Sequence, residues 1–197
     1  MDFDYNIDHI KLKKELNYLD ELIISFKKYL KEENYSIISG YIAILFGRSR
    51  SSEDIDLLVK PMTKEDFLEF WKRINKEFEC INTNDPQDAF ENYLQKDIAI
   101  RFYKSNIIIP NIEFKFLSTA LDHWILDNKL KVDINSESLF ISPLELQIAY
   151  KLFLGSEKDI EDAKFLFEIF KDQLNEEVFN SFLDSLKQQD TYRRYLI

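Results

Sequence analysis

The chain has 197 residues and a formal net charge of −10, and 45% of it is hydrophobic and 15% aromatic. This composition is typical of a packed globular protein, and the excess of acid argues against broad electrostatic binding of nucleic acid, which depends on Lys and Arg. Cys80 is the only cysteine, which excludes an intrachain disulfide and a thiolate zinc cluster.

The N-terminal sequence lacks the features of a targeting or membrane segment. It begins Met1-Asp2-Phe3-Asp4, with no basic stretch followed by an apolar run, and no part of the chain approaches the ~18 consecutive apolar residues of a membrane span. We therefore expect a cytoplasmic protein with no membrane partner.

The first sixty residues predict a long helix followed by a strand, a turn, a short helix and a second strand. In residues 11–30 apolar side chains recur at spacings of three and four, which predicts one amphipathic helix. Residues 35–38 are β-prone, Gly40 interrupts them, and 41–46 predict a short helix. Residues 54–59 predict a strand with one apolar and one acidic face.

A helix and a loop are expected next. Thr63, three residues before Asp66, has the form of a capping box and predicts a helix over 67–78. Residues 82–95 contain Asn, Asp and Pro without a clean period, and predict a loop with a little helix.

Four further strands are expected as two pairs. Residues 97–103 and 107–116 predict two strands joined by a tight turn, and Pro110 indicates an edge or a bulge in the second. Residues 130–134 and 138–141 predict two short strands.

The remainder predicts helices only. Ser142 as N-cap, followed by Pro143, predicts the start of a helix, and Gly155 predicts its end. Ser156 with Asp159 predicts the cap of the next helix, so we expect about three helices in residues 143–190. The predicted fold is α/β (α+β), a mixed sheet flanked by helices. We divide it into a core of residues 1–141 and a helical segment of residues 142–197.

Asp54 and Asp56 are the first candidates for chemistry. Two residues apart on a strand, their side chains leave the same face, so both carboxylates can reach one divalent ion such as Mg²⁺ or Mn²⁺. Chance alone gives about six acid-x-acid pairs in a chain of this composition, so the pair needs support from its surroundings.

That support comes from the stretch between residues 39 and 59. Ser39-Gly40 opens a short helix, and Arg50-Ser51-Ser52-Glu53-Asp54-Ile55-Asp56 enters a strand. This arrangement resembles the nucleotidyltransferase superfamily, and in particular its AbiEii-like branch of abortive-infection and toxin-antitoxin proteins. The resemblance implies a nucleotidyltransferase-type fold, with Asp54 and Asp56 as catalytic metal ligands.

The same resemblance implies a site for nucleotide phosphates. Ser39, Gly40, Arg50 and Ser52 are the residues it points to, and backbone NH groups at a helix start after a small-residue turn suit phosphate. Arg48 is a weaker candidate, since a solvated surface arginine explains it equally well.

A third carboxylate is expected on a neighbouring strand. Glu113 is our choice as a catalytic and metal-binding residue, and Asp97 is the alternative. Because Glu113 shares a strand face with Lys115, an ordinary charged surface also explains it.

The segment from Ile141 to Ala163 resembles the helical part that follows the core in the AbiEii-like branch. Lys151, Lys158, Asp159 and Asp162 are the matching positions. The resemblance implies that Lys151 contacts nucleotide phosphates and that Asp162 orients Lys151 or a substrate. Asp159 is equally explained as a helix-start acid.

These residues predict a metal-dependent transfer of NMP from an NTP to an acceptor hydroxyl. The acceptor is left open between an RNA 3′ end, a protein side chain and a small molecule, and a partner protein is possible. One alternative is a non-catalytic nucleotide-binding or antitoxin protein with the same fold. Another is an interaction module that dimerises through the 12–30 helix. His9 and His123 lack partners at metal-ligand spacing.

Overall fold

The computed structural model describes residues 2–6 and 9–197. Its strands are β1 (Asp2–Asn6), β2 (His9–Lys13), β3 (Tyr35–Ile38), β4 (Asp54–Val59), β5 (Phe78–Cys80), β6 (Ile100–Lys104), β7 (Ile107–Phe116), β8 (Leu130–Ile134) and β9 (Glu137–Ile141). Its α-helices are α1 (Tyr18–Lys27), α2 (Gly40–Leu45), α3 (Lys64–Ile74), α4 (Pro86–Asp88), α5 (Ala120–Asp127), α6 (Leu144–Leu154), α7 (Glu157–Phe170), α8 (Glu176–Ser185) and α9 (Gln189–Tyr195).

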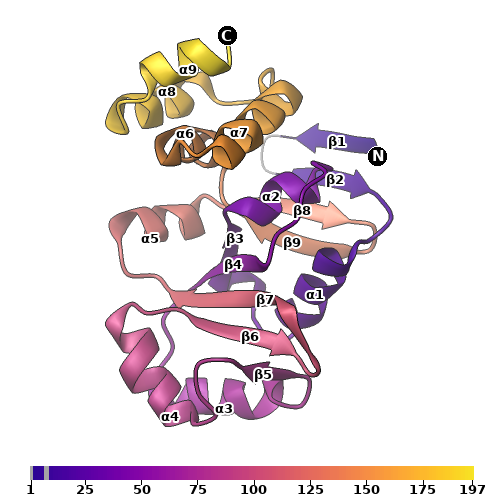
Figure 1. The fold of residues 1–197 in the computed structure, drawn as a ribbon, viewed down its shortest axis with the longest axis vertical. Coiled ribbons are helices and arrows are strands. Elements are labelled where there is room, and N and C mark those ends of the chain that lie inside the picture. The colour runs from indigo at the N-terminus through magenta and orange to yellow at the C-terminus, as the bar shows by residue number, and fades with distance from the viewer. Residues whose placement is uncertain (1, 7–8) are drawn as a thin grey trace.

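Within the described residues the strands form one nine-stranded mixed sheet in the order β1-β2-β8-β9-β3-β4-β7-β6-β5. β4 runs parallel to β7 and antiparallel to β3, and one parallel residue pair, Ile37 beside Ile141, joins the two halves of the sheet. Helices α6 to α9 gather at one end of the molecule, and α3 with α4 at the other (Figure 1). The predicted fold class, a mixed sheet flanked by helices, is confirmed.

An aromatic core fills one face of the β4-β7-β6 part of the sheet. The ring of Phe26 in α1 lies 5.5 Å from that of Phe102 in β6, and Phe70 in α3 stacks 5.5 Å from Phe114 in β7. Since successive strand residues point to opposite faces, covering this face directs the acidic residues of β4 and β7 to the other one. The core therefore determines which face of the sheet carries the acidic residues of β4 and β7.

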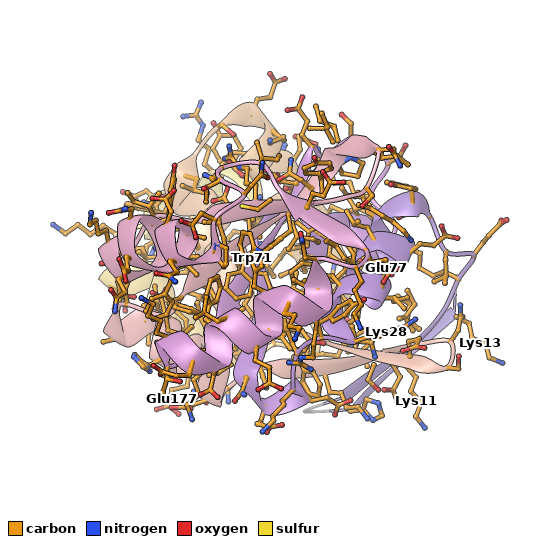
Figure 2. The ribbon with its side chains drawn as sticks, turned by 90° about the horizontal axis from the view of Figure 1, so that it is seen from below. Lys11, Lys13, Lys28, Trp71, Glu77 and Glu177 are labelled. Atoms are coloured by element: carbon orange, nitrogen blue, oxygen red, sulfur yellow. The ribbon has the colours of Figure 1, made fainter. Side chains whose placement is uncertain are left out.

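The long helix expected over residues 11–30 is wrong in its first half. Ile10 and Leu12 are 0% and 2% exposed and belong to β2, which runs parallel to β8. Lys11 and Lys13 extend from the same strand into solvent (Figure 2). The helix begins only after Asn17, whose side chain forms a capping box. Leu12 and Leu16 fit the helical spacing by coincidence, because pairing with β8 decides the conformation here.

The apolar face of α1 packs into the core. Leu22, Ile23 and Phe26 are all almost fully buried. This face is therefore closed to a partner, and the interpretation of the helix as a dimerisation module is wrong.

Residues 82–95 are more helical than expected. Asp85 accepts a hydrogen bond from the Gln87 NH and starts α4, which continues through a π-helical turn (Ala89–Tyr93) and a 3-10 turn (Leu94–Lys96). Ala89, Phe90 and Leu94 of this stretch are buried. Tertiary packing of these three side chains overrides the polar composition.

The two expected strand pairs are present. β8 and β9 match 130–134 and 138–141, and β6 and β7 pair with a register shift between Phe102 and Lys104 that agrees with the irregularity expected near Pro110. β7 is an interior strand between β4 and β6, so the alternative of an edge strand is wrong.

Helix boundaries in the C-terminal part agree with the sequence except at one start. Gly155 ends α6 at a positive φ of 69°, and Ser156 caps α7 by accepting the Asp159 NH. Ser142 is not the N-cap of α6, since the helix begins at Leu144 and the Ser142 hydroxyl donates to Gln147 instead. The division of the chain at residue 141 stays a prediction. Among the described helices, none has both the length and the apolar composition needed to span a bilayer.

Candidate active site

Three carboxylates meet where β4 lies beside β7. The parallel register places Asp56 beside Glu113 and Asp54 beside Asn111. The carboxylate oxygens of Asp54, Asp56 and Glu113 offer one ligand atom each within 4.8 Å of one another, and all three residues are partly exposed. The residues predicted on one strand and their predicted neighbour on the next strand thus form one acidic cluster.

Strand register brings Glu113, and not Asp97, beside the Asp54-Asp56 pair. Asp97 lies before β6 in a left-handed conformation with φ 59° and is not a member of the acidic cluster found in the described residues. Glu113 also accepts two hydrogen bonds on one oxygen from Arg101, at 3.1 Å from Nε and 2.7 Å from Nη2. Sequence reasoning missed Arg101, which stands opposite Glu113 only because β6 pairs with β7 in that register.

Asp56 carries the strongest electrostatic signature of the cluster. Its pKa is raised to about 6, mainly by burial and then by the charges of Asp54 and Glu113, while a hydrogen bond from the Ser39 side chain and the charge of Lys151 act in the opposite direction. Like charges gathered with too little compensation favour either a proton or a cation. The donor set consists of carboxylate oxygens alone, which suits a hard divalent ion such as Mg²⁺ or Mn²⁺.

Ser39, between β3 and α2, has an unusual backbone conformation. Its φ of 68° and ψ of −141° lie near a region used almost only by glycine, at a cost of roughly 1–3 kcal/mol. Gln147 of α6 bonds both backbone groups of Ser39, with Nε2 donating to the carbonyl at 2.8 Å and Oε1 accepting from the NH at 3.3 Å. Sequence reasoning missed Gln147, since nothing in the sequence relates it to a residue 108 positions earlier.

The Arg50 side chain lies against Gly40. A Cβ at this position would collide with Nη2 of Arg50, whose guanidinium lies against the start of α2. The Ser39-Gly40 turn was expected to allow close approach of phosphate, and here the group in close contact with it is Arg50. The assignment of Ser39 and Gly40 to phosphate binding stays a prediction.

Replacing Gly40 tests this contact. We expect Gly40→Ala to lower the free energy of unfolding by about 1–2 kcal/mol, because the displaced guanidinium loses charged hydrogen bonds. In an Arg50→Ala background the same substitution should be neutral or stabilising, since Ala is the better helix former. Urea unfolding of the four proteins measures both effects, and an equal loss in the two backgrounds would contradict the contact.

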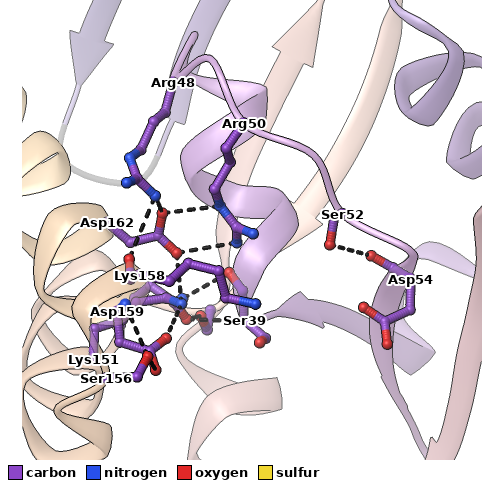
Figure 3. A network of polar contacts seen from close by, with 12 residues as sticks. Ser39, Arg48, Arg50, Ser52, Asp54, Lys151, Ser156, Lys158, Asp159 and Asp162 are labelled. Carbon is purple, nitrogen blue, oxygen red and sulfur yellow. Dashed lines mark hydrogen bonds and ion pairs between the residues drawn. The ribbon is translucent and has the colours of Figure 1, made fainter.

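The carboxylate of Asp162 in α7 joins three cations (Figure 3). It is 0% exposed, and it pairs with Arg48 Nη1, with Arg50 Nη2 at 3.0 Å and with Lys151 Nζ at 2.7 Å. Lys151 also pairs with Asp159 at 2.8 Å. The resemblance implied that Asp162 orients Lys151, and the ion pair is present, whereas the link to both arginines was not expected.

Ser52 lies two residues before β4 and bonds the backbone. Its hydroxyl donates to the carbonyl of Asp54 at 3.0 Å, close to the acidic cluster (Figure 3). This contact explains Ser52 as a local support of the strand start, and its contact with nucleotide stays a prediction.

A cavity of about 280 Å³ opens beside Asp56. Its floor is the β4-β7 surface, and its walls come from α5 and α6. Its polar lining includes Ser39, Lys115, Asp122 and Lys151. The apolar lining consists of Ile38, Leu58, Leu121, Ile125, Leu146, Tyr150 and Leu154. A mostly apolar lining with a few polar groups is typical of small-ligand sites.

The remaining reactive side chains lie outside this site. His9 Nε2 contacts Asp133 at 2.6 Å, and Cys80 is buried, which raises the pKa of its thiol. Neither histidine belongs to the acidic cluster of the described residues.

Comparison with known proteins identifies the type of fold. No protein-family model matches the chain, and no curated protein matches its sequence. A solved structure described as an antigenic nucleotidyltransferase-like protein from Paracoccidioides brasiliensis superposes with a TM-score of 0.50 at 15% identity, over 83% of this chain and 84% of that one. The chain therefore has a nucleotidyltransferase-like fold.

Proposed function

We propose that this protein is a metal-dependent nucleotidyltransferase that moves NMP from an NTP to an acceptor hydroxyl. The hydroxyl oxygen attacks the α-phosphorus, a new P–O bond forms, and the bond to the β-phosphate breaks to release pyrophosphate. The observation that carries the proposal is the meeting of Asp54, Asp56 and Glu113 within 4.8 Å, in a fold of nucleotidyltransferase type.

Asp54, Asp56 and Glu113 are the proposed holders of Mg²⁺ or Mn²⁺. When bound, such an ion supplies charge neutralisation to the nucleotide phosphates and to the departing pyrophosphate. Glu113 keeps one carboxylate oxygen that Arg101 does not contact. That oxygen is the proposed acceptor of the proton from the attacking hydroxyl.

Ser39, Gly40, Arg50, Ser52 and Lys151 are the proposed nucleotide-binding residues. Lys151 lines the same cavity as Asp56 and acts electrostatically on it, which supports a place beside the phosphates. The apolar part of the cavity is then the proposed seat of the nucleoside.

The acceptor class is left as an RNA 3′ end, a protein side chain or a small molecule. Resemblance to the AbiEii-like branch supports a place in a toxin-antitoxin or abortive-infection system, with a partner protein and a cytoplasmic location.

Calorimetric titration tests the proposal. We expect one or more of the four NTPs to bind in the presence of Mg²⁺ or Mn²⁺, and Asp54→Asn/Asp56→Asn to weaken this binding by at least about tenfold, because two of three metal ligands are lost. Asp172→Asn, an exposed aspartate outside the site, is the matched control.

Two further outcomes are informative. Absence of nucleotide binding by the folded native protein under every metal condition would contradict the proposal. Binding without transfer of label from α-³²P-NTP to RNA, protein or small-molecule acceptors would instead favour a non-catalytic nucleotide-binding protein.

A further inference from the structure

Gln147 connects the C-terminal helices to the acidic cluster through a strained residue. Gln147 is 6% exposed, and its carboxamide bonds both the NH and the carbonyl of Ser39. Its oxygen also accepts from the Ser142 hydroxyl at 3.0 Å. With two donors directed at Oε1 and one acceptor at Nε2, the orientation of the amide is determined by its partners.

The strain at Ser39 explains why such a clamp is present. A non-glycine residue near φ 68° and ψ −141° persists only when its surroundings hold it there. Ser39 directly follows Ile38, which pairs with Asp56 in the β3-β4 register, and Ser39 and Asp56 line the same cavity. A relaxed backbone at residue 39 would carry the hydroxyl elsewhere.

The same face of α6 supplies a second group to the site. Lys151 lies four residues after Gln147, one helical turn further along, and both line the cavity beside Asp56. A shift of α6 would therefore move the Ser39-Gly40 turn and Lys151 together.

We propose that Gln147 is a positioning residue that holds Ser39 in its strained conformation and so presents the Ser39 hydroxyl to Asp56 beside the nucleotide site. The inference rests on the proposed function for its binding readout. By this inference α6 helps to hold the Ser39-Gly40 turn in place, although the turn lies about a hundred residues earlier in the chain.

A double-mutant cycle separates positioning from general stability. Gln147→Met removes both bonds to Ser39 at similar volume, and Ser39→Gly removes the need for the clamp, since glycine adopts this backbone conformation freely. We expect Gln147→Met to weaken metal-dependent binding of the preferred NTP by about tenfold when measured well below its melting temperature. In the Ser39→Gly background the same substitution should change the Kd by less than about twofold.

Gln87→Met, at an exposed glutamine in α4, is the control and should match the native Kd. A native Kd in folded Gln147→Met would contradict the inference while leaving the proposed function intact, and so would equal weakening in the native and Ser39→Gly backgrounds. Absence of NTP binding by the native protein would contradict the proposed function and the inference together. A lowered melting temperature with a native Kd would assign Gln147 a structural role only.

Discussion

Asp162→Ala is expected to lower the free energy of unfolding by roughly 3–5 kcal/mol, the range seen when one partner of a buried ion pair is removed. The carboxylate is fully buried and faces Arg48, Arg50 and Lys151. Without it, three cations remain close together, and among the described residues Lys151 alone keeps an acidic partner, Asp159. Folded domains are stable by only about 5–15 kcal/mol, so a loss of this size is a large part of the total.

Urea unfolding followed by circular dichroism measures this effect. Asp172→Ala provides the control, because it removes an exposed carboxylate, and surface changes of this kind usually stay within about 0.5 kcal/mol. A loss below about 1 kcal/mol for Asp162→Ala would mean that solvent enters the cluster and compensates the arginines. Since Arg48 and Arg50 precede β4 and Asp162 lies in α7, a large loss would establish that the helical segment and the sheet unfold as one unit.

Asp56→Asn is expected to stabilise the metal-free protein at neutral pH. The pKa of Asp56 is about 6 in the folded protein against an ordinary value of 3.8, because of burial and the nearby charges of Asp54 and Glu113. A raised carboxyl pKa means that the folded state binds the proton more tightly. The resulting penalty is absent below about pH 4, grows as the pH rises, and is complete above about pH 6. One pKa unit corresponds to about 1.4 kcal/mol, so the ionised form costs on the order of 3 kcal/mol.

The measurement compares native protein and Asp56→Asn in EDTA at pH 7.5 and at pH 4.5. The variant should be more stable by about 2–3 kcal/mol at pH 7.5, and the advantage should shrink strongly at pH 4.5. Lys151 and the Ser39 hydroxyl, which favour the charged form, belong to both proteins, and their effect on Asp56 is already contained in its pKa. An advantage that does not change with pH would show that repulsion at Asp56 is not its source. Added Mn²⁺ should reverse the order, because only the native chain keeps the full carboxylate set.

Local pattern was sufficient where a signal is contained within a few residues. Alternation along β4 placed Asp54 and Asp56 on one face, and the capping signals at Thr63 and Ser156 marked helix starts that the structure contains. Pattern failed at residues 11–17, where the spacing of leucines fits a helix. There β2, which ends at Lys13, pairs with β8, and the helix begins only after Asn17. A short apolar run fits both the helical and the strand period, and only pairing with a neighbouring strand decides between the two.

The sequence by itself determined the acidic pair, its strand and the fold class, because these depend on residue type, spacing and local conformational preference. Only the tertiary structure decided which charged and amide side chains contact the residues of the site. Arg101 reaches Glu113 through the β6-β7 register, Gln147 reaches Ser39 across 108 residues, and Asp162 pairs with Arg48 and Arg50, which precede β4. Such contacts depend on strand register and on how distant segments pack, and no local period or propensity encodes either.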